Sequence, residues 1–187
     1  KRIESLRKHM QTEKIDGLLI TSSSNLRYMT HFTGTAGFAL VTLTDAIFIT
    51  DFRYTEQAGE QAKAYEIIEH KGNVLDEIAT QIKQRQIPRL GFEQEHVTYY
   101  TYEQFKEKFA CELIPTSNMI EKLRLIKDED EIQILQAAAK IADDAFEHIL
   151  TYIKPGVIER DVANELEFYM RKRGATSSSF DIIVASG

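Results

Sequence analysis

Short apolar runs alternate with amphipathic stretches along the first 120 residues of the chain. The runs are rich in Ile, Leu, Val and Phe and are too short for typical helices, so they predict buried strands. The predicted strands are Gly17–Thr21, Phe38–Leu43, Ile47–Thr50, Ala64–Glu69, Arg89–Phe92 and Glu112–Ile114. The residues from Thr44 to Ala46 form a tight connection, which makes the second and third strands antiparallel neighbours in a mixed sheet.

Helical patterns fill the spaces between these runs. One begins after Asn73, a suitable N-cap, and its apolar positions recur at a spacing of three to four residues. The predicted helices of this part are Lys1–Lys14, Asn25–His31, Phe52–Ala62, Val74–Gln86 and Tyr99–Phe109. The alternation of strands and helices predicts an α/β fold of three layers, with helices on both faces of the mixed sheet.

Longer helices follow after residue 120. Asp128 and Glu131 have the spacing of a capping box at the start of the first one, and a Lys-Pro-Gly sequence ends it. The next helix has a basic last turn and Gly174 as its C-terminal glycine. Phe180–Val184 then predicts a strand, whose backbone groups would lack a partner, so we expect the chain to be cut from a longer one. We divide it into domains at residues 1–120 and 121–187.

The composition favours a globular, cytoplasmic protein. The chain has 23 Lys+Arg and 29 Asp+Glu, a net charge of −6, which argues against a nucleic-acid groove. No apolar run reaches the ~18–20 residues of a membrane helix. The single cysteine, Cys111, excludes a disulfide scaffold and a cysteine-based zinc site within one chain. The five histidines lack metal-ligand spacing.

Polar and aromatic side chains gather at predicted strand ends and at the starts of the helices that follow. In an open α/β sheet, ligands and partners usually bind at that edge. The members of this group are Asn25, Arg27, Tyr28, His31, Asp51, Arg53 and Tyr54. A purely structural role is the alternative, in which Asp51 caps the helix that begins at Phe52 and the arginines pair locally.

Several strings of the sequence resemble the Xaa-Pro peptidase family, which includes aminopeptidase P, prolidase and, with the same fold, creatinase. Those in the first half resemble its N-terminal domain, and those in the second half resemble the start of its catalytic domain, which has the α+β pita-bread fold. The matching strings are Asn25–Gly34, Thr50–Ala58, Ile120–Asp128, Pro155–Gly156 with Glu159 and Asp161–Ala163, and Ser179–Gly187.

The resemblance implies a metallopeptidase that hydrolyses the bond between an N-terminal residue and proline. Two divalent metal ions, manganese or cobalt, would be held by two Asp, one His and two Glu, and a hydroxide between them would attack the peptide carbonyl. In the family all these ligands follow the Ala-Ser-Gly string that ends at Gly187. We therefore assign no metal ligand and no catalytic residue to this sequence, and we expect the segment alone to be inactive.

The resemblance also implies a homodimer and a proline-containing peptide as substrate. Together with the polar group at the sheet edge, it places Arg53 and Tyr54 at or near the active site of a partner subunit. His31 stands where such sequences often have a small residue, so it would alter the same contact surface. Ile158 replaces the usual Thr or Ser helix N-cap.

Two other functions compete with this interpretation. The chain could belong to a non-catalytic relative that uses the pita-bread fold to bind proteins or peptides, or to a creatine-type amidinohydrolase, which uses no metal. Whether the downstream sequence keeps all five metal ligands would decide between enzyme and binding module. The choice between dipeptidase and aminopeptidase stays open, because it depends on steric blocking around the ends of the substrate.

Overall fold

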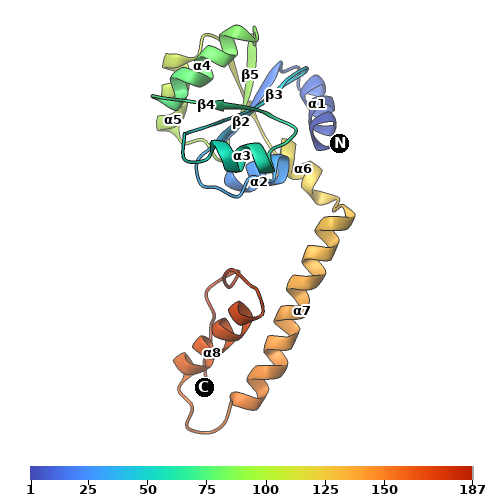
Figure 1. The fold of residues 1–187 in the computed structure, drawn as a ribbon, viewed down its shortest axis with the longest axis vertical. Coiled ribbons are helices and arrows are strands. Elements are labelled where there is room, and N and C mark those ends of the chain that lie inside the picture. Colours follow the sequence, from blue (N-terminus) through green and yellow to red (C-terminus); the bar gives the residue numbers. More distant parts are fainter. Residues whose placement is uncertain (187) are drawn as a thin grey trace. The chain divides into compact units, whose positions relative to one another are not determined.

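The computed structural model describes residues 1–186 and divides into two compact units. The first comprises Lys1–Ile126 and the second begins at Lys127. Figure 1 gives the order of their helices and strands, and each unit is described by itself below.

A six-stranded mixed sheet forms the centre of the first unit. Its strands are β1 (Gly17–Ile20), β2 (Phe38–Thr42), β3 (Ala46–Thr50), β4 (Glu66–Glu69), β5 (Arg89–Glu93) and β6 (Glu112–Thr116). The spatial order is β4-β3-β2-β1-β5-β6. β2 is antiparallel to both β1 and β3, whereas the pairs β3–β4, β1–β5 and β5–β6 are parallel. The predicted mixed α/β sheet is confirmed.

The tight connection between β2 and β3 has a local cause in its polar side chains. The Thr42 hydroxyl accepts hydrogen bonds from the backbone N–H groups of Asp45 at 2.7 Å and Thr44 at 3.2 Å. The backbone N–H of Thr42 in turn donates to the carbonyl oxygen of Asp45 at 2.9 Å. These bonds close the turn and set the antiparallel register in which Val41 lies opposite Ala46.

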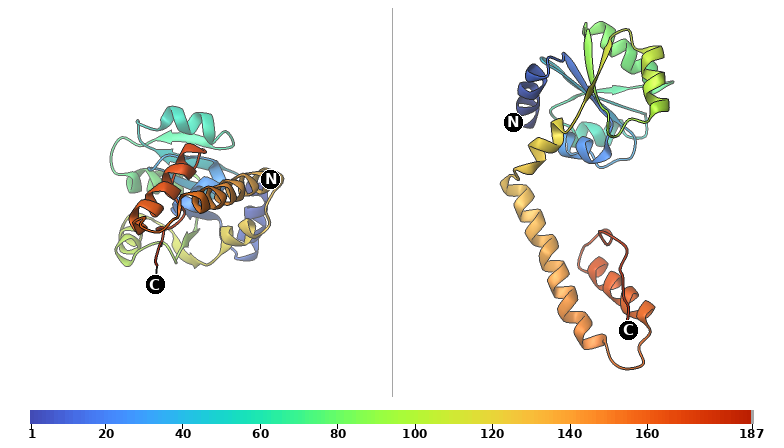
Figure 2. Two further views of the ribbon diagram at one scale, coloured as in Figure 1. Left: turned by 90° about the horizontal axis from the view of Figure 1, so that it is seen from below. Right: turned by 180° about the vertical axis from the view of Figure 1, so that it is seen from behind.

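Helices cover both faces of the sheet, which gives three layers (Figure 2). One face carries α1 (Arg2–Thr12), α2 (Ser23–Thr30), α3 (Thr55–Gln61) and α6 (Met119–Leu125), and the other carries α4 (Val74–Gln84) and α5 (Tyr99–Lys108). β1 is buried along its whole length because Leu18 faces the first of these helical layers and Leu19 the second. The predicted three-layer domain is confirmed.

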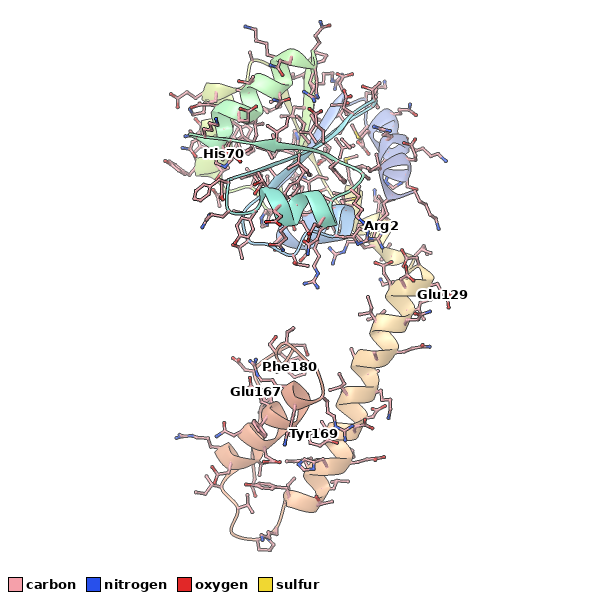
Figure 3. The ribbon with its side chains drawn as sticks, viewed as in Figure 1. Arg2, His70, Glu129, Glu167, Tyr169 and Phe180 are labelled. Carbon is pink, nitrogen blue, oxygen red and sulfur yellow. The ribbon has the colours of Figure 1, made fainter. Side chains whose placement is uncertain are left out.

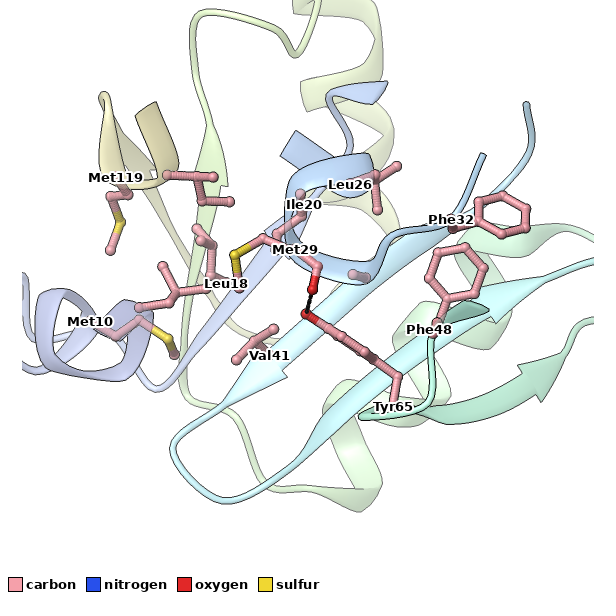
Figure 4. Packing of buried hydrophobic residues seen from close by; sticks show 14 of the residues in the cluster. Met10, Leu18, Ile20, Leu26, Met29, Phe32, Val41, Phe48, Tyr65 and Met119 are labelled. Carbon is pink, nitrogen blue, oxygen red and sulfur yellow. Dashed lines mark hydrogen bonds between the residues drawn. The ribbon is translucent and has the colours of Figure 1, made fainter. Parts of the chain in front are cut away.

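The core beneath α1, α2 and α3 combines aliphatic, aromatic and methionine side chains (Figure 4). Tyr65 lies in it with its ring buried and donates its hydroxyl hydrogen to the carbonyl oxygen of Met29 at 3.2 Å. Burial raises the pKa of Tyr65. The ring of Phe48 packs against Phe32 with 4.7 Å between centroids, so the end of α2 is fixed on the sheet.

β4 and β6 are the two edge strands of the sheet. β4 begins with Glu66 and ends with Glu69, and both side chains are exposed. β6 contains Pro115, paired in register with Phe92 of β5. Charged residues and proline are typical of strands with one open side.

The second unit contains the helices α7 (Glu129–Tyr152) and α8 (Glu159–Lys172). α7 begins with the predicted capping box, in which the backbone N–H of Glu131 donates to Asp128 Oδ1 and that of Asp128 donates to Glu131 Oε2, both at 3.0 Å. The two helices also meet through side chains, since His148 on α7 stacks on Tyr169 of α8 with 4.2 Å between ring centroids. Figure 3 labels Tyr169 on α8.

Three elements differ from the sequence-based predictions by more than two residues at an end. α3 begins at Thr55 rather than Phe52, because Asp51–Tyr54 form a separate turn. Met119–Leu125, at the predicted domain boundary, is the helix α6, and its first two residues are buried in the core of the first unit. The predicted strand Phe180–Val184 is wrong: these residues have no regular structure, since no strand within residues 127–186 offers them backbone partners.

Candidate functional site

The turn after β3 presents an arginine whose position is fixed by an aspartate two residues earlier. Arg53 donates from Nε to Asp51 Oδ1 at 2.9 Å and from Nη2 to Oδ2 at 2.8 Å, and its backbone N–H also donates to Oδ1 at 3.0 Å. The Arg53 side chain is 59% exposed, whereas that of Asp51 is 16% exposed. The pair thus forms a side-on ion pair with the guanidinium on the outside.

The two charges stabilise each other. Hydrogen bonds from Arg53 hold the pKa of Asp51 at about 2, below its ordinary 3.8, and Asp51 raises the pKa of Arg53. Of the five N–H donors of a guanidinium, Asp51 takes two, and no acceptor for the other three occurs among residues 1–186. The arrangement is suited to binding a carboxylate or a carbonyl oxygen from outside the unit.

Tyr54 lies between this arginine and the core. The Arg53 guanidinium carbon is 5.4 Å from the centroid of the Tyr54 ring, a cation–π distance. The same ring meets Phe32 edge-on, with 5.6 Å between centroids. The Tyr54 hydroxyl and Thr35 Oγ1 are hydrogen-bonded at 2.8 Å. Tyr54 therefore connects the turn after β3 with the segment that joins α2 to β2.

His31 occupies the C-cap of α2 with left-handed backbone angles, φ 65° and ψ 2°. Its backbone N–H donates to the carbonyl oxygen of Arg27 at 2.9 Å, and its side chain is exposed. The described structure gives no contact between the His31 ring and Arg53 or Tyr54. His31 is connected to them only through the chain, because Phe32, which follows it, packs on Tyr54.

The predicted polar group splits into two sites. Asn25 is 1% exposed and belongs to a second network, where its Nδ2 donates to Glu93 Oε1 at 2.7 Å and to Glu121 Oε1 at 2.6 Å. Arg124 Nη1 donates to Asn25 Oδ1 at 2.9 Å. Tyr28 also turns toward this side, donating to the carbonyl oxygen of Leu123 at 3.2 Å. These contacts fix α6 on α2.

Glu93 is the acceptor that joins this network to β1. Its Oε2 accepts from the backbone N–H groups of Thr21 at 2.7 Å and Ser22 at 2.8 Å. A pocket of about 190 Å³ lies beside Glu93, with Glu95 and His96 also in its lining. Glu93 was not among the predicted site residues, although a carboxylate at the C-terminal end of a predicted strand is a signal that could have indicated it.

Within residues 1–186, no group of three or more His, Cys, Asp or Glu side chains is arranged to hold a metal ion. Burial raises the pKa of the Cys111 thiol to about 11. None of the helices in the same range has the length and apolarity needed to cross a membrane.

Comparison with known families agrees with this architecture. Residues 2–126 match the Creatinase/Prolidase N-terminal domain, and residues 133–187 match Metallopeptidase family M24. The fold thus defines a three-layer α/β domain of the creatinase and prolidase type. The chain belongs to the family of the Creatinase/Prolidase N-terminal domain.

Individual relatives are similar over the whole chain. The uncharacterized peptidase YqhT of Bacillus subtilis is 57% identical over 187 residues, which are 100% of this chain and 53% of that protein. The Xaa-Pro dipeptidase of Pyrococcus furiosus is 34% identical over 192 residues, covering 100% of this chain and 52% of that one. The structure of Xaa-Pro dipeptidase from Bacillus anthracis matches with a TM-score of 0.96 and 58% identity over 98% of this chain and 52% of its own. The chain spans about half the length of these relatives.

Proposed function

We propose that this chain is part of a metal-dependent Xaa-Pro peptidase, which hydrolyses the bond between an N-terminal residue and a following proline. The observation that carries the proposal is the order of the two family matches along one chain, a Creatinase/Prolidase N-terminal domain followed by Metallopeptidase family M24. The relatives named Xaa-Pro dipeptidase support the substrate class.

Metallopeptidase family M24 implies divalent metal ions, and we propose manganese or cobalt. The side chains of residues 1–186 do not fit a metal centre of that kind, because the required cluster of carboxylates and imidazoles does not occur among them. The ions would be bound by other residues of the whole protein. The composition favours a cytoplasmic location for it.

Within this peptidase we propose that Arg53 and Tyr54 lie at or near the active site of a partner subunit in a homodimer, with His31 on the same surface. The support is chemical: Arg53 is anchored by Asp51 and exposed, and it has three N–H donors directed at no acceptor in residues 1–186. A peptide substrate offers the carboxylate and carbonyl oxygens that such a cation binds.

The activity is tested on the whole protein with an Ala-Pro dipeptide, an Ala-Pro-Ala tripeptide and an Ala-Ala control. We expect cleavage before proline with added manganese, no cleavage after chelation, and recovery when metal returns. The ratio of the two proline substrates distinguishes dipeptidase from aminopeptidase. Binding of the peptides without cleavage would instead favour the non-catalytic alternative.

The role of Arg53 is tested by Arg53→Ala, with Lys106→Ala as the matched control, since Lys106 is another exposed cation in a local ion pair. We expect kcat/KM for the proline peptide to fall by at least about 10-fold in Arg53→Ala and to stay unchanged in the control. Unchanged hydrolysis and unchanged dimer mass in Arg53→Ala would contradict the assignment.

A further inference from the structure

The segment between α2 and β2, Thr33–Gly37, is tied to the elements on both sides of Arg53. On the α3 side, the backbone N–H of Thr33 donates to Gln61 Oε1 at 2.9 Å, and Gln57 Nε2 donates to Thr33 Oγ1 at 2.9 Å. On the β3 side, the buried hydroxyl of Thr50 donates to the carbonyl oxygen of Ala36 at 2.7 Å. The segment is therefore held at both ends, and Gly34 and Thr35 lie between these anchors.

Gly34 leaves room for two aromatic rings. A β-carbon at this position would come within 2.3 Å of Phe32 Cζ and 2.9 Å of Tyr54 Cδ1, distances that real β-carbons do not reach. Phe32 is only 3% exposed and packs on Phe48, so its ring has little space to retreat. A side chain at Gly34 would therefore force the ring of Phe32 or of Tyr54 to shift.

Thr35 supplies the one hydrogen bond that the structure gives to the Tyr54 hydroxyl within residues 1–186. The ring held in this way lies against the Arg53 guanidinium at 5.4 Å. Asp51 holds two N–H donors of Arg53, and the ring of Tyr54 is the second group that the structure places against the guanidinium within residues 1–186.

We propose that Thr35 is a positioning residue for Arg53: its hydroxyl fixes the ring of Tyr54, and the ring directs the free N–H donors of the guanidinium. Gly34 makes this contact possible because it has no β-carbon. The consequence for the reaction rests on the proposed peptidase function, in which Arg53 binds the substrate. Thr35 itself touches no substrate.

The central variant is Thr35→Val, which removes the hydroxyl and keeps the shape of the side chain. In the whole protein with an Ala-Pro substrate, we expect kcat/KM to fall about 5-fold, mainly through a higher KM, as for the loss of one hydrogen bond. Tyr54→Phe should give the same fall, and Thr35→Ser should restore the activity. Thr80→Val is the matched control, since Thr80 is also exposed and bonded, but lies on α4 across the sheet.

A double-mutant cycle separates positioning from a general structural effect. Thr35→Val should change nothing further in an Arg53→Ala background; a further fall of similar size would overturn the proposal. Full activity of Thr35→Val beside an impaired Arg53→Ala would overturn it too, while the proposed role of Arg53 would stand. An unimpaired Arg53→Ala would instead contradict that role.

A measurement that needs no activity completes the test. The order parameter of the Arg53 Nε–H bond, from nitrogen-15 relaxation, should fall in Thr35→Val and in Tyr54→Phe but not in Thr80→Val. An Arg53 side chain that stays as ordered in Thr35→Val as in the unmodified protein would overturn the proposal, whatever the peptidase assays show. Tyr54→Phe keeps the test decisive if Thr35→Val fails to fold.

Discussion

The ion pair between Asp51 and Arg53 determines the acidic pH range in which the turn after β3 loses stability. The folded-state pKa of Asp51, about 2, is lower than its ordinary value of 3.8 because Arg53 donates hydrogen bonds to the carboxylate. A depressed pKa contributes stability that is fully present above the ordinary value and is lost as the pH falls through the folded value. The Asp51 carboxylate is therefore ionised, and the pair is intact, above about pH 4.

The first prediction concerns that acid range. The difference in free energy of unfolding between the unmodified protein and Asp51→Asn should be constant above about pH 4 and should shrink as the pH falls toward about 2. Urea unfolding at a series of pH values measures it. The exposed ion pair Lys140–Asp144 offers Asp144→Asn as a comparison. If this difference in free energy of unfolding for Asp51→Asn were already lost when the pH had fallen to 4, the assigned pKa of Asp51 would be wrong.

His31 provides a second prediction at the residue scale. A side chain in the left-handed region at φ 65° is strained relative to glycine. We expect His31→Gly to raise the free energy of unfolding by about 1 kcal/mol, measured by urea unfolding. His31→Ala is the control, because it deletes the ring but keeps the β-carbon; an equal gain from both variants would show that the ring, not the backbone, is the cause.

At the scale of elements, the sequence is sufficient to predict the strands of the first unit, because each is a short apolar run between polar turns. All six strands overlap their predicted ranges, with ends that differ by at most two residues. α6 is harder to predict because it has only seven residues and begins after Asn118, a left-handed N-cap without a side-chain bond to the helix. The strand predicted at Phe180–Val184 fails because an apolar run alone does not supply a neighbouring strand.

The candidate site could be predicted only in part, because some of its contacts join residues that are far apart in the sequence. Arg53 and Tyr54 are close to Asp51 in sequence, so their grouping could be inferred. The bonds of Asn25 to Glu93 and Glu121 span 68 and 96 residues. The positioning of Tyr54 by Thr35 spans 19 residues across two strands. Such pairs depend on the order of strands in the sheet, which local patterns do not contain.

The third prediction concerns the docking of α6. Asn25→Ala should lower the free energy of unfolding by about 2–3 kcal/mol, because it leaves the carboxylates of Glu93 and Glu121 without their shared amide donor. Asn73→Ala, which removes only the N-cap of α4, should cost about 1 kcal/mol. Equal losses in urea unfolding would mean that the Asn25 network contributes no more than one cap.

The fourth prediction belongs to the whole molecule. Residues 1–187 produced alone should cleave no Xaa-Pro peptide, since peptide hydrolysis of this kind needs two metal ions and no cluster for them occurs in residues 1–186. The assay compares this segment with the whole protein, each with added manganese. Exposed carboxylates bind manganese loosely, so weak binding decides nothing. Stoichiometric tight binding with measurable cleavage by the segment would contradict the prediction.

The edge strands of the sheet affect whether copies of the molecule aggregate in concentrated solution. An open strand is a template on which another chain can add a strand, the first step of fibril growth. At β4 an added strand would have to desolvate the charged side chains of Glu66 and Glu69. At β6 it would lie against Pro115, which has no N–H to donate. Fibril growth by strand addition is thus disfavoured at both edges of the sheet.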